Sequence, residues 1–444
     1  MLLAIASVLV IAALAALILR PTLGIPLLFL VRPIVDATWA EPVFFDLNLL
    51  DVLGTLAPAI VICHAILGRG GSSFARIPVK GPWLALSAYT FVFSSIILFG
   101  DGWLTGLDVF FRQISGIVGF FMLQAWFRTE ADLRRLFGTI ALAGIFPMAI
   151  GLYEIATGVH WTEWQVEGLA RNVGLYHDAF SVRFYMMQTL LSTLLYAALS
   201  PRLGVGRLAV AATYATGALV VVFKAYSKSA ISTLLLWALA WTVLRRRWAL
   251  LGAGAAVVAV VGTVFYSELT QPIAQLFNKE LSAIAGQGAL DVTFQGRWLS
   301  WREMIDDWRA LSPWQQVFGS GMKSTGAHND YLQLLFHGGV VGLSLYLTLL
   351  VAIGARVVRN ARKRPSALNV AAVMALSMWI VDSIGLVPSA YPAYQWFVWG
   401  LIGVACRVDA DGATEAREPR SKTSRIAFNY SPTRLGSRTV RDSR

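Results

Sequence analysis

The chain has 444 residues, of which 57% are hydrophobic and only 14% are charged. Soluble proteins are about one-quarter charged, so this composition excludes an ordinary soluble protein and predicts a polytopic membrane protein. The formal net charge of +12 does not indicate nucleic-acid binding, because the basic residues lie in short loops between apolar segments. The 16 Trp and 13 Tyr residues are typical of aromatic belts at membrane interfaces.

Apolar stretches of spanning length predict eleven helices, at about 46–67, 82–99, 108–127, 133–156, 183–200, 208–223, 229–243, 249–266, 330–353, 368–387 and 392–406. The first 35 residues are interrupted at Arg20-Pro21 and at Pro26, and we expect one net crossing there. The sequence therefore predicts an all-α protein with about twelve transmembrane helices and both termini inside. Cys63 and Cys406 lie in apolar segments and indicate no disulfide framework. No cleavable signal is evident at the start of the chain.

The distribution of Lys and Arg predicts the orientation of these helices. The loops at 68–81, 128–135, 201–207, 244–248 and 354–367 hold sixteen basic residues, whereas the short intervening loops hold three, namely Arg171, Lys224 and Lys228. The basic loops should be cytoplasmic, which places segments 157–182 and 267–329 on the outer side. The tail at 407–444, rich in Arg, Ser and Thr, is expected to be disordered and cytoplasmic.

Within the long outer segment, residues 297–308 have helical spacing. Trp298, Trp301, Ile305 and Trp308 gather on one side, which favours an amphipathic helix at the membrane surface. A helix that only closes the loop over the bundle explains the tryptophans equally well. It does not explain Arg297 at the start of the helix.

The stretch 319–342 joins a glycine-rich polar loop to a long apolar helix, with His328 and Asn329 at the junction. On a 3.6-residue repeat, His337 points roughly away from His328, so the two histidines should not share a site. Gly338 and Gly342 form a Gly-x-x-x-Gly pair, which predicts close helix packing. Spacing alone does not decide between a catalytic His328 and a polar residue at a helix end.

Several of these segments together resemble the superfamily of O-antigen ligases and polymerases. The most specific match is the run His328-Asn329-Asp330-Tyr331-Leu332, between Gly319-Ser-Gly321 and Gly338-Gly-Val-Val-Gly342. Three further motifs match. An Arg and a Gly ahead of a His-containing turn correspond to Arg171, Gly174 and His177. A basic residue between serines corresponds to Lys228, and an Arg-x-x-x-Trp element corresponds to Arg297 and Trp301. Asp178 and Ala179, which follow His177, depart from the first of these motifs. The run from Phe29 to Asp36 is similar to members associated with exosortase-type export.

The resemblance implies a fold and an activity. Residues 1–406 would form a transmembrane ligase or polymerase domain, with a GT-C-like helix bundle, in the bacterial inner membrane. The enzyme would move a polyprenyl-diphosphate-linked saccharide to an acceptor hydroxyl on lipid A-core or protein at the periplasmic face, with inversion. His328 would be the general base, and Arg297, Arg171 and Lys228 would bind the diphosphate. Supporting residues would be Asn329, His177 and Trp301. No metal, cofactor or nucleic acid is expected to take part, and membrane lipid is an expected partner.

Two alternatives remain open at this point. A polymerase would share the same motifs and extend a lipid-linked glycan instead. A transporter would recognise the same lipid-linked glycan without chemistry, but it should show an inverted repeat or a charge near the middle of the membrane. Each basic residue taken singly is more commonly an interface anchor. Their common side and order along the chain favour the functional interpretation.

Overall fold

The protein folds almost entirely into α-helices. The computed structural model describes residues 1–44, 47–68, 77–100, 103–200, 204–249, 263–321 and 328–415, together with positions 252, 256 and 260. Predicted apolar stretches form α3 (Leu49–Ile66), α4 (Lys80–Gly100), α5 (Trp103–Trp126), α8 (Ala179–Leu199), α9 (Val205–Lys224), α10 (Lys228–Arg245), α16 (Asp330–Lys363), α17 (Ala367–Gly385) and α18 (Pro392–Glu415). The stretch at 133–156 is divided at Gly144 into α6 (Glu130–Ala143) and α7 (Ile145–Thr157). Most of the stretch at 249–266 lies outside the described residues.

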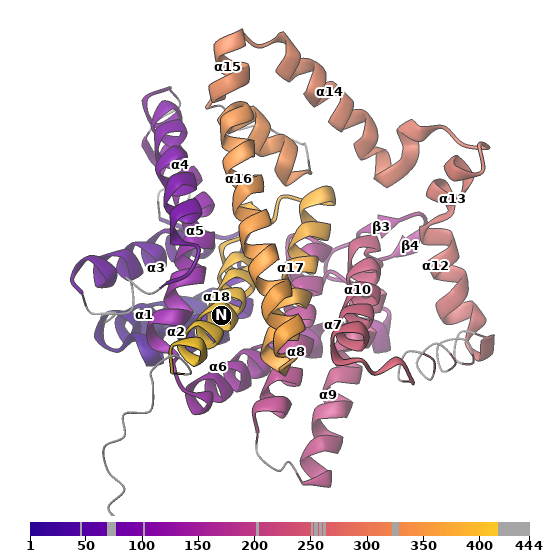
Figure 1. The fold of residues 1–444 in the computed structure, drawn as a ribbon. Helices are drawn as coiled ribbons and strands as arrows, with labels where there is room; N and C mark the ends of the chain where they lie inside the picture. Colours follow the sequence, from indigo (N-terminus) through magenta and orange to yellow (C-terminus); the bar gives the residue numbers. More distant parts are fainter. Residues whose placement is uncertain are drawn as a thin grey trace, which may run out of the picture.

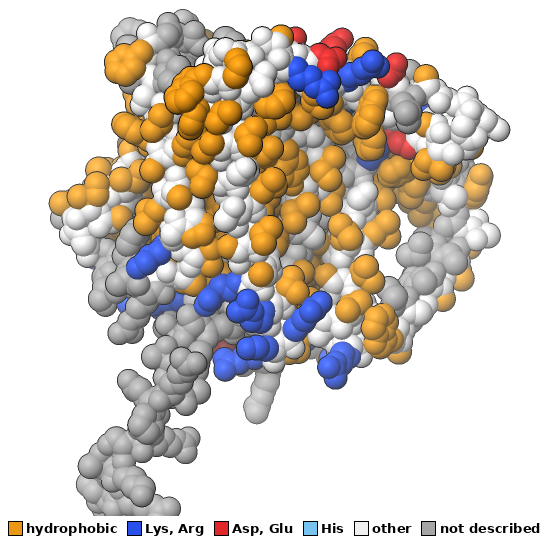
Figure 2. Space-filling model, turned by 45° about the horizontal axis from the view of Figure 1, so that its top comes forward, with side chains coloured by type: hydrophobic (Ala, Val, Ile, Leu, Met, Phe, Trp, Pro, Cys, Tyr) orange, Lys and Arg blue, Asp and Glu red, His pale blue; other side chains and the backbone are white. Residues whose placement is uncertain are grey.

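Among the described ranges, six helical segments are long and apolar enough to cross a membrane, namely Leu2–Leu19, Leu49–Ile66, Glu130–Thr157, Val205–Lys224, Asp330–Lys363 and Ala367–Gly385. Figure 2 shows a broad hydrophobic face above a group of Lys and Arg side chains, with acidic and basic side chains mixed at the opposite edge. A wide apolar band with basic groups along one border is the surface expected of a protein that sits in a bilayer. The molecule is therefore a helical membrane protein.

The first 36 residues contain one helix that is long and apolar enough to cross a membrane, but they do not form a single kinked helix. They form two helices, α1 (Leu2–Leu19) and α2 (Pro21–Asp36), which pack side by side. The turn is so tight that a Cβ on Gly24 would lie 2.3 Å from the backbone of Leu17, and the Leu17 carbonyl oxygen is 3.0 Å from Nε2 of His64 near the end of α3. The chain thus folds back at Arg20, on the side where the basic loops are predicted. Pro21 starts a new helix there instead of bending a continuous one.

The core lies where α18 packs between α5 and α17. Trp379, Trp396, Trp399 and Tyr394 are among the largest fully buried side chains. Gly119 of α5 permits the close approach of α18, because a Cβ there would lie 2.7 Å from the Cα of Trp396. Helix α18 continues past the predicted end at 406 to Glu415, and residues 416–444 of the predicted tail lie outside the described part of the chain.

The long segment at 267–329, which the sequence predicts to lie outside, is helical over most of its described residues. It forms α12 (Gln271–Leu276), α13 (Asn278–Ile284), α14 (Arg297–Ala310) and α15 (Pro313–Phe318); α14 and α15 lie above one end of the bundle, and α13 and α12 run down beside α10 (Figure 1). In α14 the buried Met304 lies on the same side as the partly buried Trp301 and Trp308, whereas Trp298 is 42% exposed. The predicted apolar face is therefore present, but Trp298 stands at its edge. Two short hairpins, β1 (Pro42–Phe44) with β2 (Leu47–Asn48) and β3 (Gln165–Val166) with β4 (Leu169–Ala170), interrupt the all-α pattern.

Helix α16 is broken at Gly339, whose backbone is not helical and has a φ of 61°. The chain before α16 packs into this break, so that a Cβ on Gly339 would lie 2.4 Å from the carbonyl oxygen of Val317. The N–H groups of Ser320 and Gly321 donate to the carbonyl oxygens of Phe336 and His337, at 3.0 and 3.2 Å. The short first part of α16, which follows His328, is thus clamped to the end of the long outer segment.

The predicted Gly-x-x-x-Gly contact is present in the structure. A Cβ on Gly338 or Gly342 would lie 3.4 or 3.1 Å from the ring of Tyr89 in α4. The Tyr89 hydroxyl donates to the carbonyl oxygens of Phe318 and Gly338, at 2.8 and 3.0 Å. The close packing of α16 on α4 therefore also stabilises the non-helical backbone at the break in α16.

Candidate active site at the outer ends of the helices

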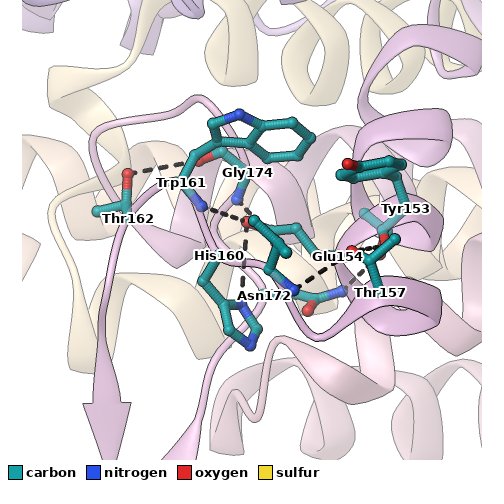
Figure 3. A network of polar contacts seen from close by, with 10 residues as sticks. Tyr153, Glu154, Thr157, His160, Trp161, Thr162, Asn172 and Gly174 are labelled. Atoms are coloured by element: carbon teal, nitrogen blue, oxygen red, sulfur yellow. Dashed lines mark hydrogen bonds and ion pairs between the residues drawn. The ribbon is translucent and has the colours of Figure 1, made fainter.

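A buried carboxylate, that of Glu154 near the end of α7, fixes the first outer loop (Figure 3). Its two oxygens accept hydrogen bonds from the backbone N–H groups of Trp161 and Gly174, at 3.2 and 3.1 Å. Asn172 donates from its side chain to a backbone carbonyl of α7, at 2.9 Å, and from its N–H to the last carbonyl of α9. The loop is therefore tied to two helix ends just beside Arg171.

Arg171 lies within this loop and is held in place by backbone contacts. Its Nε donates to the carbonyl oxygen of Ala225, at 2.8 Å. Burial, followed by the positive charges of Arg183 and Arg297, lowers the pKa of the Arg171 guanidinium to about 10, although Asp178 opposes this shift. The group is still charged at neutral pH. The predicted site residue Arg171 is thus electrostatically coupled to Arg297, from which it is far in sequence.

Arg183, which the sequence analysis did not single out, is the third arginine of this group. It lies one turn into α8, is 2% exposed, and donates from Nη1 to Asp382 at 2.6 Å and to Ser229 at 2.8 Å. The other oxygen of Asp382 accepts from the Tyr394 hydroxyl at 2.7 Å. The sequence does contain a signal for this pair: Arg183 and Asp382 each lie in an apolar stretch, and a charged residue in such a stretch is rare unless it has a partner of opposite charge.

The carboxyl-terminal end of α17 brings Arg297 and Asn329 together. Arg297, the first residue of α14, donates from Nη1 to the carbonyl oxygen of Gly385. Asn329 donates from Nδ2 to the neighbouring carbonyl oxygen of Ile384, at 3.0 Å. Carbonyl groups in the last turn of a helix have no partner inside it and carry partial negative charge. They are suited to hold an arginine and an amide donor side by side.

His328 lies next to this anchor and is exposed. Its φ of 42° is left-handed, an unfavourable conformation for a residue other than glycine. Asn329 stabilises this junction as the N-cap of α16, since its side chain accepts from the N–H of Leu332 at 3.0 Å. Partial burial of the ring, followed by the charge of Arg297, lowers the pKa of His328, although Asp178 acts in the opposite direction. A neutral imidazole is therefore favoured at neutral pH.

Arg171, Arg183, Arg297 and His328 form one electrostatic group. Burial and the charge of Arg183 also lower the pKa of Arg297. The charge of Arg183 is already balanced by Asp382, whereas Arg171 and Arg297 each donate to a neutral backbone carbonyl, so a bound anion would be favourable beside these two. The arrangement is thus suited to an anion with a neutral base beside it.

The other predicted site residues lie around this group. His177 is exposed and contacts the carboxylate of Asp178 at 3.8 Å, and its ring packs edge-on against Trp39 with centroids 4.5 Å apart. This contact with the Asp178 carboxylate raises the pKa of His177, against the effect of burial. Trp301 packs on Phe294, with ring centroids 5.5 Å apart, and lines a surface hollow with Asn329.

Lys228 has a different environment from the three arginines. Its ammonium group is 2.6 Å from a carboxylate oxygen of Glu280, and the same oxygen accepts from the N–H of Phe294 at 2.8 Å. Burial alone would raise the pKa of Glu280, but the hydrogen bonds from Lys228 and Phe294 hold it below its usual range. This bridge ties the start of α10 to the segment that leads into Arg297. The geometry thus gives Lys228 a role in positioning the long loop.

Within the part of the chain that the structure describes, no three His, Cys, Asp or Glu residues are grouped so as to hold a metal ion. Arginine side chains supply positive charge near His328. His337 is 1% exposed and packs against Phe93, so it does not face His328. Comparison with models of protein families and with curated protein sequences finds no match for this chain.

Proposed function

We propose that this protein is a glycan transferase of the O-antigen ligase type, which acts at the periplasmic face of a bacterial inner membrane. The observation that carries the proposal is the convergence of Arg171, Arg183, Arg297 and His328 from four separate segments. A polyprenyl-diphosphate-linked saccharide offers both groups that this arrangement suits. Its diphosphate is an anion, and its sugar carbon is open to attack by an activated hydroxyl.

His328 is the general base of the proposed reaction. Its neutral imidazole takes the proton from the acceptor hydroxyl while that oxygen forms a bond to the anomeric carbon. The bond from the same carbon to the diphosphate oxygen breaks, and the electron pair leaves with the lipid diphosphate. Attack from the side opposite the leaving group inverts the anomeric centre.

Arg171 and Arg297 stabilise the negative charge that grows on the departing diphosphate. A guanidinium group offers two parallel donors to phosphate oxygens, and both residues are already fixed by one backbone carbonyl each. Arg183 is engaged with Asp382 and Ser229, so it adds positive potential rather than a fork of free donors. Lys228 keeps the long loop in place through Glu280.

The acceptor distinguishes the forms of this activity. A ligase transfers the saccharide to lipid A-core or to a protein, whereas a polymerase transfers it to a second lipid-linked glycan. A transporter would move the lipid-linked glycan and form no glycosidic bond. Purified protein with radiolabelled lipid-linked donor and each acceptor in turn separates these outcomes by the product formed.

The decisive variant is His328→Ala. Loss of a general base should lower the transfer rate by about 10²- to 10⁴-fold, while binding of the lipid-linked donor is kept. His337→Ala serves as the matched control, because that ring lies in the same short helical segment but packs away from the site against Phe93. Equal losses from the two variants would show that the fold of this segment, and not base chemistry, explains the effect.

A further inference from the structure

A cavity lies beside the proposed active site. It has a volume of about 290 Å³ and is lined by residues of α2, α3, α5, α8 and the start of α18. This size is at the lower end of the roughly 300–1,000 Å³ of small-molecule sites. Its lining includes Arg32 and Asp36, from the run Phe29–Asp36 that the proposed reaction does not use.

The charges that line this cavity are balanced. Arg32 is paired through Nε with Asp36, and Arg112 is paired with Asp51 at 3.1 Å. Two positive and two negative groups therefore face the same space. This differs from the arginine group of the active site and is unsuited to a phosphate, which would meet two carboxylates.

Arg32 is buried, at 4% exposed, and is held by Asp36 through Nε. Its Nη1 makes no hydrogen bond among the described residues and has almost no accessible surface, so the group acts on the cavity through its charge and not through a direct hydrogen bond.

The lining also contains the aromatic residues Trp39, Phe111 and Tyr391, together with His177. A saccharide ring has hydroxyl groups that both donate and accept hydrogen bonds, so it can use arginine and aspartate at once. Its C–H faces can pack on aromatic rings. Balanced ion pairs with aromatic walls therefore match an uncharged sugar.

Asp178 connects this cavity with the active site. Its carboxylate accepts from the Tyr391 hydroxyl at 3.1 Å and contacts His177, and both of these residues line the cavity. The same carboxylate interacts electrostatically with Arg171 and His328. Through His177 and Tyr391 the cavity thus borders Asp178, which belongs to the same segment as Arg171.

We propose that the cavity between Arg32, Arg112 and Tyr391 binds an uncharged sugar residue of the glycan substrate. This inference rests on the proposed function, because that function supplies the sugar. The sugar belongs either to the lipid-linked donor or to a glycan acceptor. The cavity positions that sugar while the arginine group holds the diphosphate. It is a specificity site, and its residues take no part in proton transfer.

Protection of an introduced cysteine tests the proposal. Thr55 lines the cavity, and Thr55→Cys is made with Cys63→Ser and Cys406→Ala, so that only one thiol reacts with maleimide. Saccharides released by mild acid from the host's own lipid-linked glycans should slow its labelling at least about fivefold. Inorganic phosphate and pyrophosphate should not. A cysteine at the exposed position of Glu163 serves as the control and should be unaffected.

Arg112→Ala should abolish this protection, and its side chain is 35% exposed, so the change disturbs the fold little. Protection by pyrophosphate but not by saccharides, no protection by any saccharide, or protection that survives Arg112→Ala would each overturn the proposal. The inactive His328→Ala protein should still be protected, which separates this result from a failure of the proposed reaction. With intact lipid-linked donor as the probe, loss of protection in Arg297→Ala assigns the sugar to the donor, and retention assigns it to the acceptor.

Discussion

Removal of the Glu154 carboxylate should open the first outer loop without unfolding the bundle. The side chain is fully buried, and its oxygens accept from the N–H groups of Trp161 and Gly174. A hydrogen bond to a charged group contributes about 1.5–3 kcal/mol. Glu154→Ala should therefore destabilise the closed loop by about 3–6 kcal/mol in total, with two buried donors left unpaired. Glu154→Gln keeps one acceptor oxygen and should cost about half as much.

Hydrogen exchange of the loop amides, followed by mass spectrometry in detergent, measures this change directly. Each 1.4 kcal/mol is a factor of ten, so exchange between residues 159 and 176 should accelerate about 10²- to 10⁴-fold in Glu154→Ala. Glu163→Gln is the matched control, because that carboxylate is exposed in the same loop. Unchanged exchange in Glu154→Ala, or an equal effect of Glu154→Gln, would refute the assigned role of the carboxylate.

Further predictions concern the proposed reaction. Arg297→Lys should impair transfer almost as much as Arg297→Ala, because a point charge cannot reproduce the two parallel hydrogen bonds to a diphosphate; near-normal activity of the lysine variant would identify Arg297 as an interface anchor. Since burial and Arg297 lower the pKa of His328 below its usual value of about 6.5, kcat should be retained below that pH and fall only as the ring becomes protonated. In Arg297→Gln the acidic fall of the residual kcat should move to higher pH, and an unmoved profile would contradict the coupling. Transfer by the purified protein should persist in excess EDTA, because arginines supply the charge near the diphosphate; loss of transfer with recovery on adding Mg²⁺ would point to a metal site.

The positions of the helices follow from the sequence because each depends on a continuous apolar stretch. The start of α16 was equally predictable, since glycines and Asn329 mark a turn and a helix cap. The helical hairpin at Arg20 was not predictable, because a proline after a basic residue is compatible both with a kink in one helix and with the first residue of a second helix. Only packing of α1 on α2 decides between them.

The candidate site was predictable only in part. Arg171, Arg297 and His328 stand out as polar residues on the predicted outer side. The pairing of Arg183 with Asp382 joins α8 to α17, and sequence pattern does not specify contacts between distant helices. The partner of Lys228 could not be predicted for the same reason, because Glu280 is 52 residues away in the chain. Residues were thus easier to identify than their partners.

The contacts around the break in α16 have a consequence for how far the chain length can vary there. Ser320 and Gly321 are bonded to Phe336 and His337, and Asn329 is bonded to the end of α17. The two ends of the connection between Gly321 and His328 are therefore fixed independently of what joins them. Doubling the length of a connecting segment costs only about 0.6 kcal/mol. The number of residues between 321 and 328 can thus vary during evolution while His328 and the arginines keep their places.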